Sequence, residues 1–599
     1  MSATPTAVAP PTVAERPPPR SWPAAQWLVL GCYLLGAVAV TARLWVDPAG
    51  RMQAGDPQDV NLVAWYMRYA ATAVSHGHLP ALITTALNAP RGINMMWQAS
   101  SMLPGMLLTP VTLLAGPQVS LTILLTLSFA GSAASLFWVL RRWGASVIGA
   151  ALGGALYGFS PAMINSGTGH YQLISAVLPP LIIHMVLRIV TGRGRPVRNG
   201  AWLGLLTAAQ IFSGEELLVY TAVAAVALMA ALALGHPRAV PGRVRDTAAG
   251  LLTGAAVTLL ISGYALWVQF RGPFHEHGAL YGSWSNNPAY FVEPSGNLLF
   301  HTQSSAAFVA SFILGVPEVL AYLGWPLIVV LVAAAVCFWR DPKVRAAAVT
   351  CAVLELCSLG GGPQMIRGFR LSGSFLPYHW IQGLPGLAQV IPSRFCLLGA
   401  GAAGAVLAFS LDRARSAVPA DRGWLRGLPV VVVALAMVPL IPLPYQALPV
   451  PAVPAGWQAA FARLRLAPDA PVLVIPVTLL GHTQVMRWLA DTGEPGSMIG
   501  GYFLAPNPTG EAVFSPIGPT EPTAEYLNHL WSGKARVRPS SAAQVRSALD
   551  SWRPAAVIAV TAAGSRLGQF LIRVLGRPGF RGGGVLAWPL RARGQAPGG

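Results

Sequence analysis

Long apolar stretches alternate with short polar segments over most of the first 447 residues. A helix that crosses the roughly 30 Å hydrocarbon core of a bilayer needs about 20 apolar residues, or fewer where neighbouring helices thin the barrier. The pattern therefore predicts a polytopic membrane protein with eleven spans, of which two are short. The predicted spans are 25–46, 118–140, 145–161, 174–191, 200–214, 216–234, 247–269, 319–339, 345–359, 395–411 and 428–446.

Basic residues gather in alternate loops between these spans, and cytoplasmic loops are the ones that retain Arg and Lys. With the N-terminus inside, the inner segments hold eighteen positive charges, whereas the longer outer loops hold seven. This bias predicts a cytoplasmic N-terminus and a C-terminus on the outer side. The inner charges are Arg16, Arg20, Arg141, Arg142, Arg188, Arg193, Arg195, Arg198, Arg238, Arg243, Arg245, Arg340, Lys343, Arg345, Arg413, Arg415, Arg422 and Arg426.

Three outer loops are long, and the first of them, 47–117, has structure of its own. Within it, residues 58–75 place apolar side chains at helical spacing, with Trp65 and Tyr66 able to sit among lipid headgroups. We expect an amphipathic helix that lies on the membrane. The apolar stretch 102–115 contains two prolines and is short, so we interpret it as a re-entrant or interfacial piece. The other long outer loops are 270–318 and 360–394.

The composition changes near residue 448, where polar and acidic residues increase and membrane-length apolar runs end. Short runs typical of buried strands and two helical segments predict an outer α/β domain. The Gly582-Gly583-Gly584 run precedes a strand and opens no helix, which disfavours a phosphate-binding loop. The predicted strands are 472–477, 555–560 and 585–590, and the helices are 481–491 and 564–576. The predicted domains are a disordered cytoplasmic tail at 1–22, a transmembrane domain at 23–447 and an extracytoplasmic α/β domain at 448–599.

Composition and charge support a membrane protein and argue against a soluble protein and a nucleic-acid-binding protein. The chain has 599 residues, of which 54% are hydrophobic and 10% charged, whereas soluble proteins carry about 25% charged residues. The net charge of +19 comes from clusters between spans instead of a basic face with aromatic residues, so no nucleic acid is expected as a partner. All five cysteines fall in apolar spans, so neither a disulfide framework nor a Cys metal motif is predicted.

Asp56 and Asp59 are the first candidates for chemistry, because they lie about ten residues beyond the first span. Carboxylates at the outer membrane surface could serve as a base for a lipid-linked substrate. Asp56 followed by Pro57 also reads as the start of a helix, since Asp is a good N-cap and Pro suits the first turn. Both interpretations of Asp56 can hold. Asp59 is a substrate-binding candidate, although a first-turn partner of the helix dipole is the stronger interpretation.

A second group of polar side chains lies at outer ends of later spans. Glu215 and Glu216 mark the junction of the fifth and sixth spans, where a carboxylate pair is costly unless it is wet, paired or bound to metal. They could bind a metal, an acceptor or a phosphosugar, or they could form a solvated turn. His170 falls in the same layer and could bond phosphate or sugar hydroxyls, although a structural histidine is favoured.

Arginines and two further acids complete the candidates. Arg394 opens the tenth span from outside, where its guanidinium could grip a phosphate with two hydrogen bonds or snorkel to headgroups. Arg91 faces the same choice. Glu318 and Glu355 lie near outer span ends, and we expect each to pair with a buried Arg.

Several segments together carry a resemblance to a known superfamily. They are GDPQDVNLVAWYMRYAATAVSHGHLP from residue 55, APRGINMMWQASSMLPGMLLTPVTLLAGP from 89, LRRWGAS from 140, GTGHYQLISAVLPPLI at 167–182, SGEELLVYTA at 213–222, PGLAQVIPSRF at 385–395 and MRWLADTGEPGSMIGGYF at 486–503. With the acidic first outer loop and the multi-span bundle, these segments resemble an uncharacterised bacterial branch of the glycosyltransferase C (GT-C) superfamily. The likeness extends through nearly the whole chain.

The resemblance implies a function as well as a fold. GT-C enzymes use polyprenyl-phosphate sugars, so it implies transfer of a sugar to a cell-envelope glycan, lipid or protein on the outer face of a bacterial plasma membrane. One carboxylate base suffices for an inverting reaction if cations stabilise the departing phosphate. An acid early in the first outer loop acts as base in the superfamily, and Asp56 occupies that place. Many relatives hold a metal through a later acidic motif, but no clear DxD occurs here. A divalent cation, Mg²⁺ or Mn²⁺, therefore stays an open candidate cofactor.

Two other classes of function compete with this interpretation. A transporter or flippase of lipid-linked sugars would be expected to show charged or broken helices at mid-membrane depth and an internal repeat. This chain instead keeps its acids at one surface and shows no internal repeat. A non-catalytic envelope-assembly protein with the same fold is the third class, and unchanged activity after Asp56→Ala would indicate it.

Overall fold

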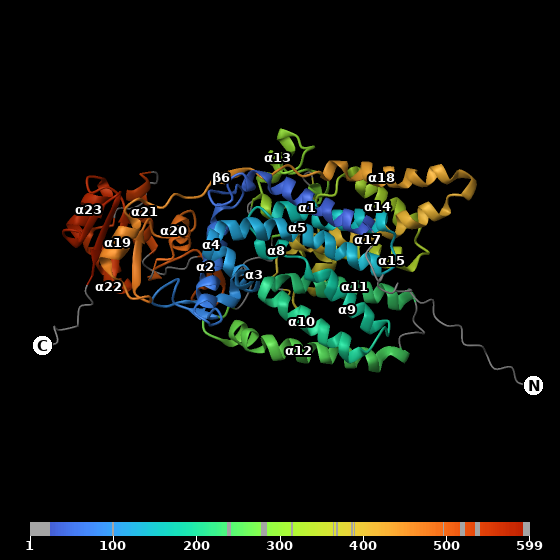
Figure 1. The fold of residues 1–599 in the computed structure, drawn as a ribbon, viewed down its shortest axis with the longest axis horizontal. Helices are drawn as coiled ribbons and strands as arrows, with labels where there is room; N and C mark the ends of the chain where they lie inside the picture. Colours follow the sequence, from blue (N-terminus) through green and yellow to red (C-terminus); the bar gives the residue numbers. More distant parts are fainter. Residues whose placement is uncertain are drawn as a thin grey trace, which may run out of the picture. The chain divides into compact units, whose positions relative to one another are not determined.

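The computed structural model describes most of the chain and divides it into two compact units (Figure 1). The helical unit comprises Met1–Trp45, Leu124–Ser262 and Tyr281–Tyr445, and the mixed unit comprises Val46–Ile123, Gly263–Leu280 and Gln446–Gly599. The described residues are 24–98, 101–235, 241–276, 284–312, 315–362, 364–366, 369–384, 387, 390–494, 496–514, 521–533 and 540–590. The predicted disordered tail at 1–22 lies outside them.

The helical unit is built from membrane-length and shorter helices. They are α1 (Ala24–Trp45), α5 (Pro117–Arg142), α6 (Val147–Gly158), α7 (Pro161–Ser166), α8 (Tyr171–Ile174), α9 (Leu178–Val190), α10 (Pro196–Gly214), α11 (Glu216–Gly235), α12 (Val244–Arg271), α13 (Gln303–Ala310), α14 (Trp325–Cys337), α15 (Pro342–Ser358), α16 (Pro377–Ile381), α17 (Cys396–Ala417) and α18 (Leu428–Met437), with the hairpin β4 (Gln364–Ile366) and β5 (Phe369–Leu371). α5 and α12 each have one end in the mixed unit.

Each predicted span overlaps a helix, but only seven helical segments among the described residues are long and apolar enough to cross a membrane, so the predicted number of eleven spans stays a prediction. α9 and α14 are apolar but shorter. The predicted span 145–161 is interrupted at Phe159 and Ser160, where α6 ends and Ser160 caps α7. The protein is thus a multi-pass, mainly helical membrane protein.

Glycines bring pairs of helices into backbone contact. A Cβ added at Gly153 of α6 would lie 2.5 Å from the Gly404 carbonyl oxygen of α17, and one at Gly404 would lie 2.4 Å from the Gly153 oxygen. Gly200 of α10 faces the Gly250 oxygen of α12 in the same way, at 2.2 Å. Small residues that let backbones approach are a common device in membrane bundles. Figure 1 shows α10 beside α12, and α9 also packs against α10.

The mixed unit combines the first outer loop with the C-terminal segment. Its loop elements are β1 (Arg51–Gln53), α2 (Pro57–Ser75), β2 (Ile83–Thr84), β3 (Ile93–Asn94), α3 (Met102–Leu107) and α4 (Thr109–Ala115). Its C-terminal elements are β6 (Ala447–Pro449), α19 (Trp457–Leu464), β7 (Pro471–Ile475), α20 (Gln484–Thr492), β8 (Ser497–Met498), β9 (Leu504–Pro506), β10 (Ala512–Phe514), α21 (Glu521–Ser532), α22 (Ala542–Trp552), β11 (Ala556–Val560), α23 (Arg566–Leu575), β12 (Phe580–Gly582) and β13 (Val585–Pro589).

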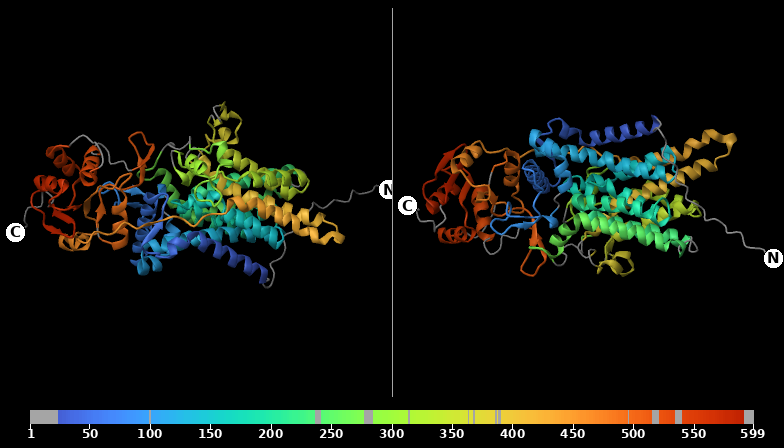
Figure 2. Two further views of the ribbon diagram at one scale, coloured as in Figure 1. Left: turned by 90° about the horizontal axis from the view of Figure 1, so that it is seen from above. Right: turned by 60° about the horizontal axis from the view of Figure 1, so that its bottom comes forward.

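The predicted α/β character of the C-terminal segment is confirmed (Figure 2). Its sheet has the order β12-β13-β11-β7-β8, in which β7 pairs in parallel with β11 and β8 while β13 runs antiparallel to β11. Buried residues such as Ile475, Val557 and Leu571 form one apolar core between the sheet and its helices. Gly583 and Gly584 have positive φ and form the turn of the β12–β13 hairpin, so this glycine run makes a turn and not a phosphate loop.

The helix predicted at 58–75 is present as α2, but its surroundings differ from the expectation. Trp65 and Tyr66 are 7% and 1% exposed, and α2 packs against α3, α4 and α20. These rings are therefore buried in protein and not placed among headgroups. The sequence pattern shows which positions are apolar but cannot show whether lipid or protein covers them. The stretch 102–115 forms the two short helices α3 and α4, neither of membrane length.

Candidate functional site

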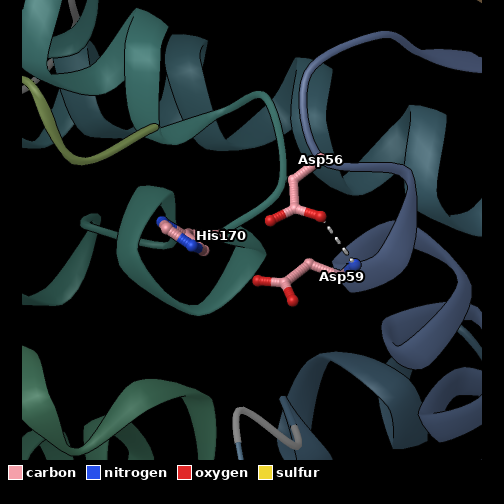
Figure 3. A group of neighbouring side chains, drawn as sticks. All are labelled: Asp56, Asp59 and His170. Carbon is pink, nitrogen blue, oxygen red and sulfur yellow. Dashed lines mark hydrogen bonds between the residues drawn. The ribbon is translucent and has the colours of Figure 1, made fainter. Parts of the chain in front are cut away.

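Asp56 lies in the turn between β1 and α2. β1 pairs antiparallel with β6, which fixes the first loop to the start of the C-terminal segment. The Asp56 carboxylate caps α2, because its Oδ1 accepts hydrogen bonds from the backbone N–H groups of Gln58 (3.2 Å) and Asp59 (3.3 Å). Figure 3 shows the second of these bonds. The N-cap interpretation is therefore confirmed. A base role does not conflict with it, since the carboxylate is half-buried and held in a defined orientation.

Asp59 follows in the first turn of α2, and its partner Tyr502 is not among the site residues predicted from the sequence. The Tyr502 hydroxyl donates a hydrogen bond of 3.0 Å to Asp59 Oδ1. Burial raises the pKa of Tyr502 strongly, and the negative charges of Asp59 and Asp56 add to the shift. The tyrosine therefore remains a hydrogen-bond donor at neutral pH. Tyr502 lies inside the segment MRWLADTGEPGSMIGGYF, so the family resemblance held a signal for it.

Two carboxylates lie close together at the beginning of α2. Ligand oxygens of Asp56 and Asp59 lie within 4.8 Å of each other. Burial, together with the charge of Asp59, also raises the pKa of Tyr66 well above its ordinary value. Burial is thus the main reason that Tyr66 and Tyr502 stay protonated, and the charge of Asp59 adds to the shift at both.

Polar contacts join α2 to the C-terminal segment within the mixed unit. Gln58 Oε1 accepts a hydrogen bond from the Gly481 backbone N–H, and Asn61 Nδ2 donates to Thr483 Oγ1 at 3.1 Å. Arg68 Nε donates to the Ala490 carbonyl oxygen at 2.6 Å. The first two contacts hold the start of α2 against the loop before α20, and the third joins the middle of α2 to α20 itself.

A buried ionic cluster occupies the helical unit around Arg394. The side chain is 9% exposed and lies in the 3₁₀ turn η7 (Pro392–Phe395) that begins α17. It makes two hydrogen bonds to Glu318, including Nε to Oε2 at 3.0 Å, and a third to Glu216 Oε2. The expected pairing of Glu318 with a buried Arg is therefore present. The Arg394 guanidinium binds two carboxylates of the protein itself.

Tyr220 and His170 extend this cluster. The Tyr220 hydroxyl donates to Glu216 Oε1, and it also lies 3.0 Å from the Ile391 carbonyl oxygen. Glu216 and Tyr220 are four residues apart on α11, a spacing that places two side chains on one helix face and could have revealed the pair. His170 Nδ1 lies 3.6 Å from Glu318 Oε1 and is 8% exposed. A protonated His170 would bring a second positive charge to the two glutamates.

The remaining candidates are placed as follows. Glu215 occupies the single-residue break between α10 and α11 and is half-buried. Arg91 is exposed in the turn between β2 and β3. Glu355 has no arginine partner among the residues that the structure describes; its Oε2 instead accepts a hydrogen bond from the Cys396 thiol at 3.0 Å. Figure 3 draws His170, at the start of α8 in the helical unit, with the two aspartates of the mixed unit.

Comparisons with solved structures identify the fold. The arabinofuranosyltransferase AftD from mycobacteria is similar, with a TM-score of 0.52 and 14% identity over 92% of this chain and 36% of AftD. An oligosaccharyltransferase from Archaeoglobus fulgidus gives a TM-score of 0.50 and 11% identity over 89% of this chain and 69% of that protein. This chain therefore spans about a third of the length of AftD. The predicted GT-C fold is confirmed.

Comparisons of sequence match a smaller part of the chain than comparisons of structure do. Among curated proteins, none matches the chain. One family model matches residues 28–364, a region that begins in α1, includes the first outer loop and ends at β4. Since this match covers more than half of the sequence, the chain belongs to the family described as "Domain of unknown function (DUF6311)".

Proposed function

We propose that this protein is an inverting membrane glycosyltransferase that moves a sugar from a polyprenyl-phosphate carrier to a cell-envelope acceptor. The observation that carries the proposal is the acidic turn at Asp56, fixed at the start of α2 in a GT-C fold. The fold is shared with an arabinofuranosyltransferase and an oligosaccharyltransferase, which supports sugar transfer as the reaction class. The charge pattern of the loops supports an outer-face reaction with the C-terminal segment on that side.

The proposed mechanism has one base and one displacement. Asp56 accepts the proton of the acceptor hydroxyl while the resulting oxygen attacks the anomeric carbon. The bond from that carbon to the phosphate oxygen breaks on the opposite face, and polyprenyl phosphate leaves with the bonding electrons. The configuration at the anomeric carbon is inverted by this single displacement. The two N–H bonds to Asp56 Oδ1 fix the orientation of the base during the transfer.

The other candidates receive supporting roles in this proposal. His170, Glu215 and Glu216 contribute to binding of the phosphosugar, and Arg394 positions Glu216 and Glu318 through its ion pairs. Asp59 and the exposed Arg91 are assigned to substrate binding in the mixed unit. Because Arg394 is bonded to both glutamates, we assign it a positioning role and not direct capture of the lipid phosphate.

A divalent cation fits the donor set at the start of α2. Asp56 and Asp59 offer hard carboxylate oxygens within 4.8 Å of each other, the type of ligand that Mg²⁺ and Mn²⁺ prefer. Both oxygens of Glu216 are already bonded within the helical unit, which makes Glu216 a weaker ligand. A bound cation would supply positive charge to stabilise the departing phosphate.

The decisive experiment compares purified wild-type protein with Asp56→Asn on a panel of radiolabelled polyprenyl-phosphate sugars and envelope acceptors. Asn is as good an N-cap as Asp, so the substitution removes the base and leaves α2 intact. We expect transfer to fall by about 10²-fold or more. Asp47→Asn is the matched control, because Asp47 is an exposed acid of the same loop that also accepts a backbone N–H, from Gly50 at 2.9 Å.

Two results would contradict the proposal. Transfer that is equal in wild type and Asp56→Asn would remove Asp56 as base. Carrier-dependent flipping of the lipid-linked sugar in vesicles, without transfer to any acceptor, would instead favour the transporter class. A titration of activity with Mg²⁺ and Mn²⁺ in wild type and Asp59→Asn tests the cation separately, since weaker metal activation in the variant is expected only if Asp59 is a ligand.

A further inference from the structure

An exposed aromatic ring is linked to the acidic turn within the mixed unit. Phe514 ends β10, and its ring stacks on the ring of Tyr502, with the ring centres 5.4 Å apart and an angle of 8° between the planes. The Tyr502 hydroxyl in turn donates its hydrogen bond of 3.0 Å to Asp59. A single side chain therefore connects Phe514 to Asp59, which lies three residues from Asp56.

Phe514 remains exposed although Tyr502 covers one face of its ring. Phe514 is 40% exposed, whereas Tyr502 is 4% exposed and the neighbouring Phe503 is fully buried. An exposed apolar side chain needs no explanation when it stands alone on a surface. Its link to the proposed catalytic turn is what distinguishes Phe514.

The hairpin β9–β10 that carries Phe514 is fixed to the first outer loop. Phe514 is opposite Leu504 in the antiparallel register of the hairpin. The Gln98 side chain bonds both backbone groups of Leu504, because its Oε1 accepts the N–H at 2.9 Å and its Nε2 donates to the carbonyl oxygen at 2.6 Å. The Tyr66 hydroxyl of α2 donates to the same Gln98 Oε1 at 3.3 Å. A ligand of Phe514 would therefore not have to order the hairpin when it binds.

The tip of the hairpin is polar, which argues against insertion into lipid. Asn507, Thr509 and the Glu511 carboxylate are hydrogen-bonded to one another at this tip. Glu511 lies three residues before Phe514, or about 10 Å along an extended strand. Because a carboxylate is costly in hydrocarbon, an aqueous ligand suits this surface better than an acyl chain does.

A sugar ring is the ligand that fits an exposed aromatic ring close to a proposed base. The C–H groups on the face of a sugar are apolar and can pack on an aromatic ring, while the sugar hydroxyls stay available to polar groups. If one sugar of an acceptor presents its hydroxyl to Asp56, the next sugar of the same chain extends beyond the turn. The Phe514 ring offers that second sugar an apolar surface.

We propose that Phe514 binds a sugar ring adjacent to the one that is attacked, so that the acceptor is a glycan of at least two sugars. The inference rests on the proposed function for the role of Asp56, but binding of a glycan at Phe514 does not require transfer. Phe514 contributes to the choice of acceptor and takes no part in the displacement itself.

The test measures binding without any sugar donor, so that it is independent of transfer. Full-length protein in neutral detergent is titrated with fluorescent tetrasaccharides of arabinose, mannose and N-acetylglucosamine, and fluorescence anisotropy gives each dissociation constant. We expect at least one tetrasaccharide to bind wild type, and to bind Phe514→Leu about fivefold more weakly, because Leu is apolar but has no ring face. Phe514→Trp should restore the affinity.

A matched variant separates this ring from exposed phenylalanines in general. Phe300→Leu is the control, because Phe300 is 52% exposed and belongs to the helical unit. It should leave glycan binding unchanged. Phe514 is exposed at the end of a strand, so both of its substitutions are compatible with folding, and melting temperatures in detergent check this.

Four results would overturn the proposal. They are equal affinity of wild type and Phe514→Leu, a loss that Phe514→Trp does not restore, the absence of binding of every tetrasaccharide to wild type, and binding that is present in detergent but lost in lipid nanodiscs. The last result would mean that lipid covers Phe514. Glycan binding that depends on Phe514 in a protein without transferase activity would refute the proposed reaction and leave this binding site standing.

Discussion

The hydrogen bond from Tyr502 to Asp59 connects two residues that are more than 400 positions apart in sequence. The hydroxyl of a buried tyrosine needs a hydrogen-bond partner. The Asp59 carboxylate gains a neutral donor, which does not cancel its negative charge. Asp56 differs, because its Oδ1 is bonded to the backbone of its own helix. The two aspartates therefore lie close together, but different hydrogen bonds hold their side chains.

Tyr502→Phe tests the link at Asp59. The substitution removes the donor and leaves the ring stacked on Phe514. Since hydrogen bonds to charged groups contribute about 1.5–3 kcal/mol, we expect the free energy of unfolding to fall by about that amount. Chemical unfolding followed by tryptophan fluorescence measures it. A double-mutant cycle with Asp59→Asn should show non-additive effects, and strictly additive effects would argue against the bond.

Glu276 gives a second prediction at this scale. It is a buried carboxyl of the mixed unit whose Oε1 has no hydrogen-bond partner in the part of the chain that the structure describes. Burial raises its pKa from 4.5 to about 8. Between these two values the folded state keeps a proton that the unfolded state has lost, so this group lowers stability as pH rises from about 4.5 to about 8.

Glu276→Gln should remove this dependence, because Gln stays neutral at every pH. The stability of the variant relative to wild type is expected to rise between pH 5 and pH 8 and to stay level above that. Denaturation midpoints at pH 5, 6.5 and 8.5 provide the measurement. Parallel profiles for the two proteins would show that Glu276 does not titrate in this window.

Helix packing is the clearest feature at the element scale. Gly153 and Gly404 bring α6 and α17 into backbone contact, and the carbonyl oxygens leave no room for a side chain. α17 follows directly on Arg394 in η7 and lines an apolar cavity of the helical unit further along. The position of both features thus depends on the same helix contact.

Gly404→Val should force α6 and α17 apart. We expect a loss of at least about 2 kcal/mol in stability and a lower melting temperature in detergent, as for other overpacked core positions. Gly31→Val in α1 is the control, because no atom lies within 4 Å of a Cβ at Gly31. Equal melting temperatures for the two variants would mean that the α6–α17 contact tolerates a side chain.

At the scale of the whole molecule, the chain forms two compact units from interleaved segments. The first outer loop belongs with the C-terminal segment through the β1–β6 pairing and the contact of α2 with α20. From the sequence alone, that loop is expected to belong to the transmembrane domain, since it lies between two spans. The C-terminal segment is thus a structural partner of the loop that carries Asp56.

The predicted topology has its own test. An alkaline phosphatase reporter fused after residue 599 should be active, whereas reporters inserted near Gly194 or Gly423 should be inactive, because the bias of Arg and Lys assigns those loops to the cytoplasm. A green fluorescent reporter should give the opposite pattern. Active phosphatase at Gly423 would place Asp56 on the wrong side for a polyprenyl-phosphate sugar presented outside.

The sequence by itself determined the local features of this protein. The length of the apolar runs and the bias of basic residues predicted the helices and the polar turns. The Asp56-Pro57 pair predicted the start of α2. Both follow because caps and spans depend on neighbouring residues. The strands at 472–477, 555–560 and 585–590 followed from short β-branched runs in the same way. The family resemblance added the fold, which the comparisons confirm.

Only the tertiary structure decided which distant side chains meet. Tyr502 at Asp59, Glu318 at Arg394, the thiol of Cys396 at Glu355 and the burial of Trp65 all depend on contacts between segments far apart in the chain. A hydrophobic pattern records that a position avoids water, but lipid and protein satisfy it equally. Burial and pairing are therefore properties of the packed chain, whereas spans and caps are properties of its local sequence.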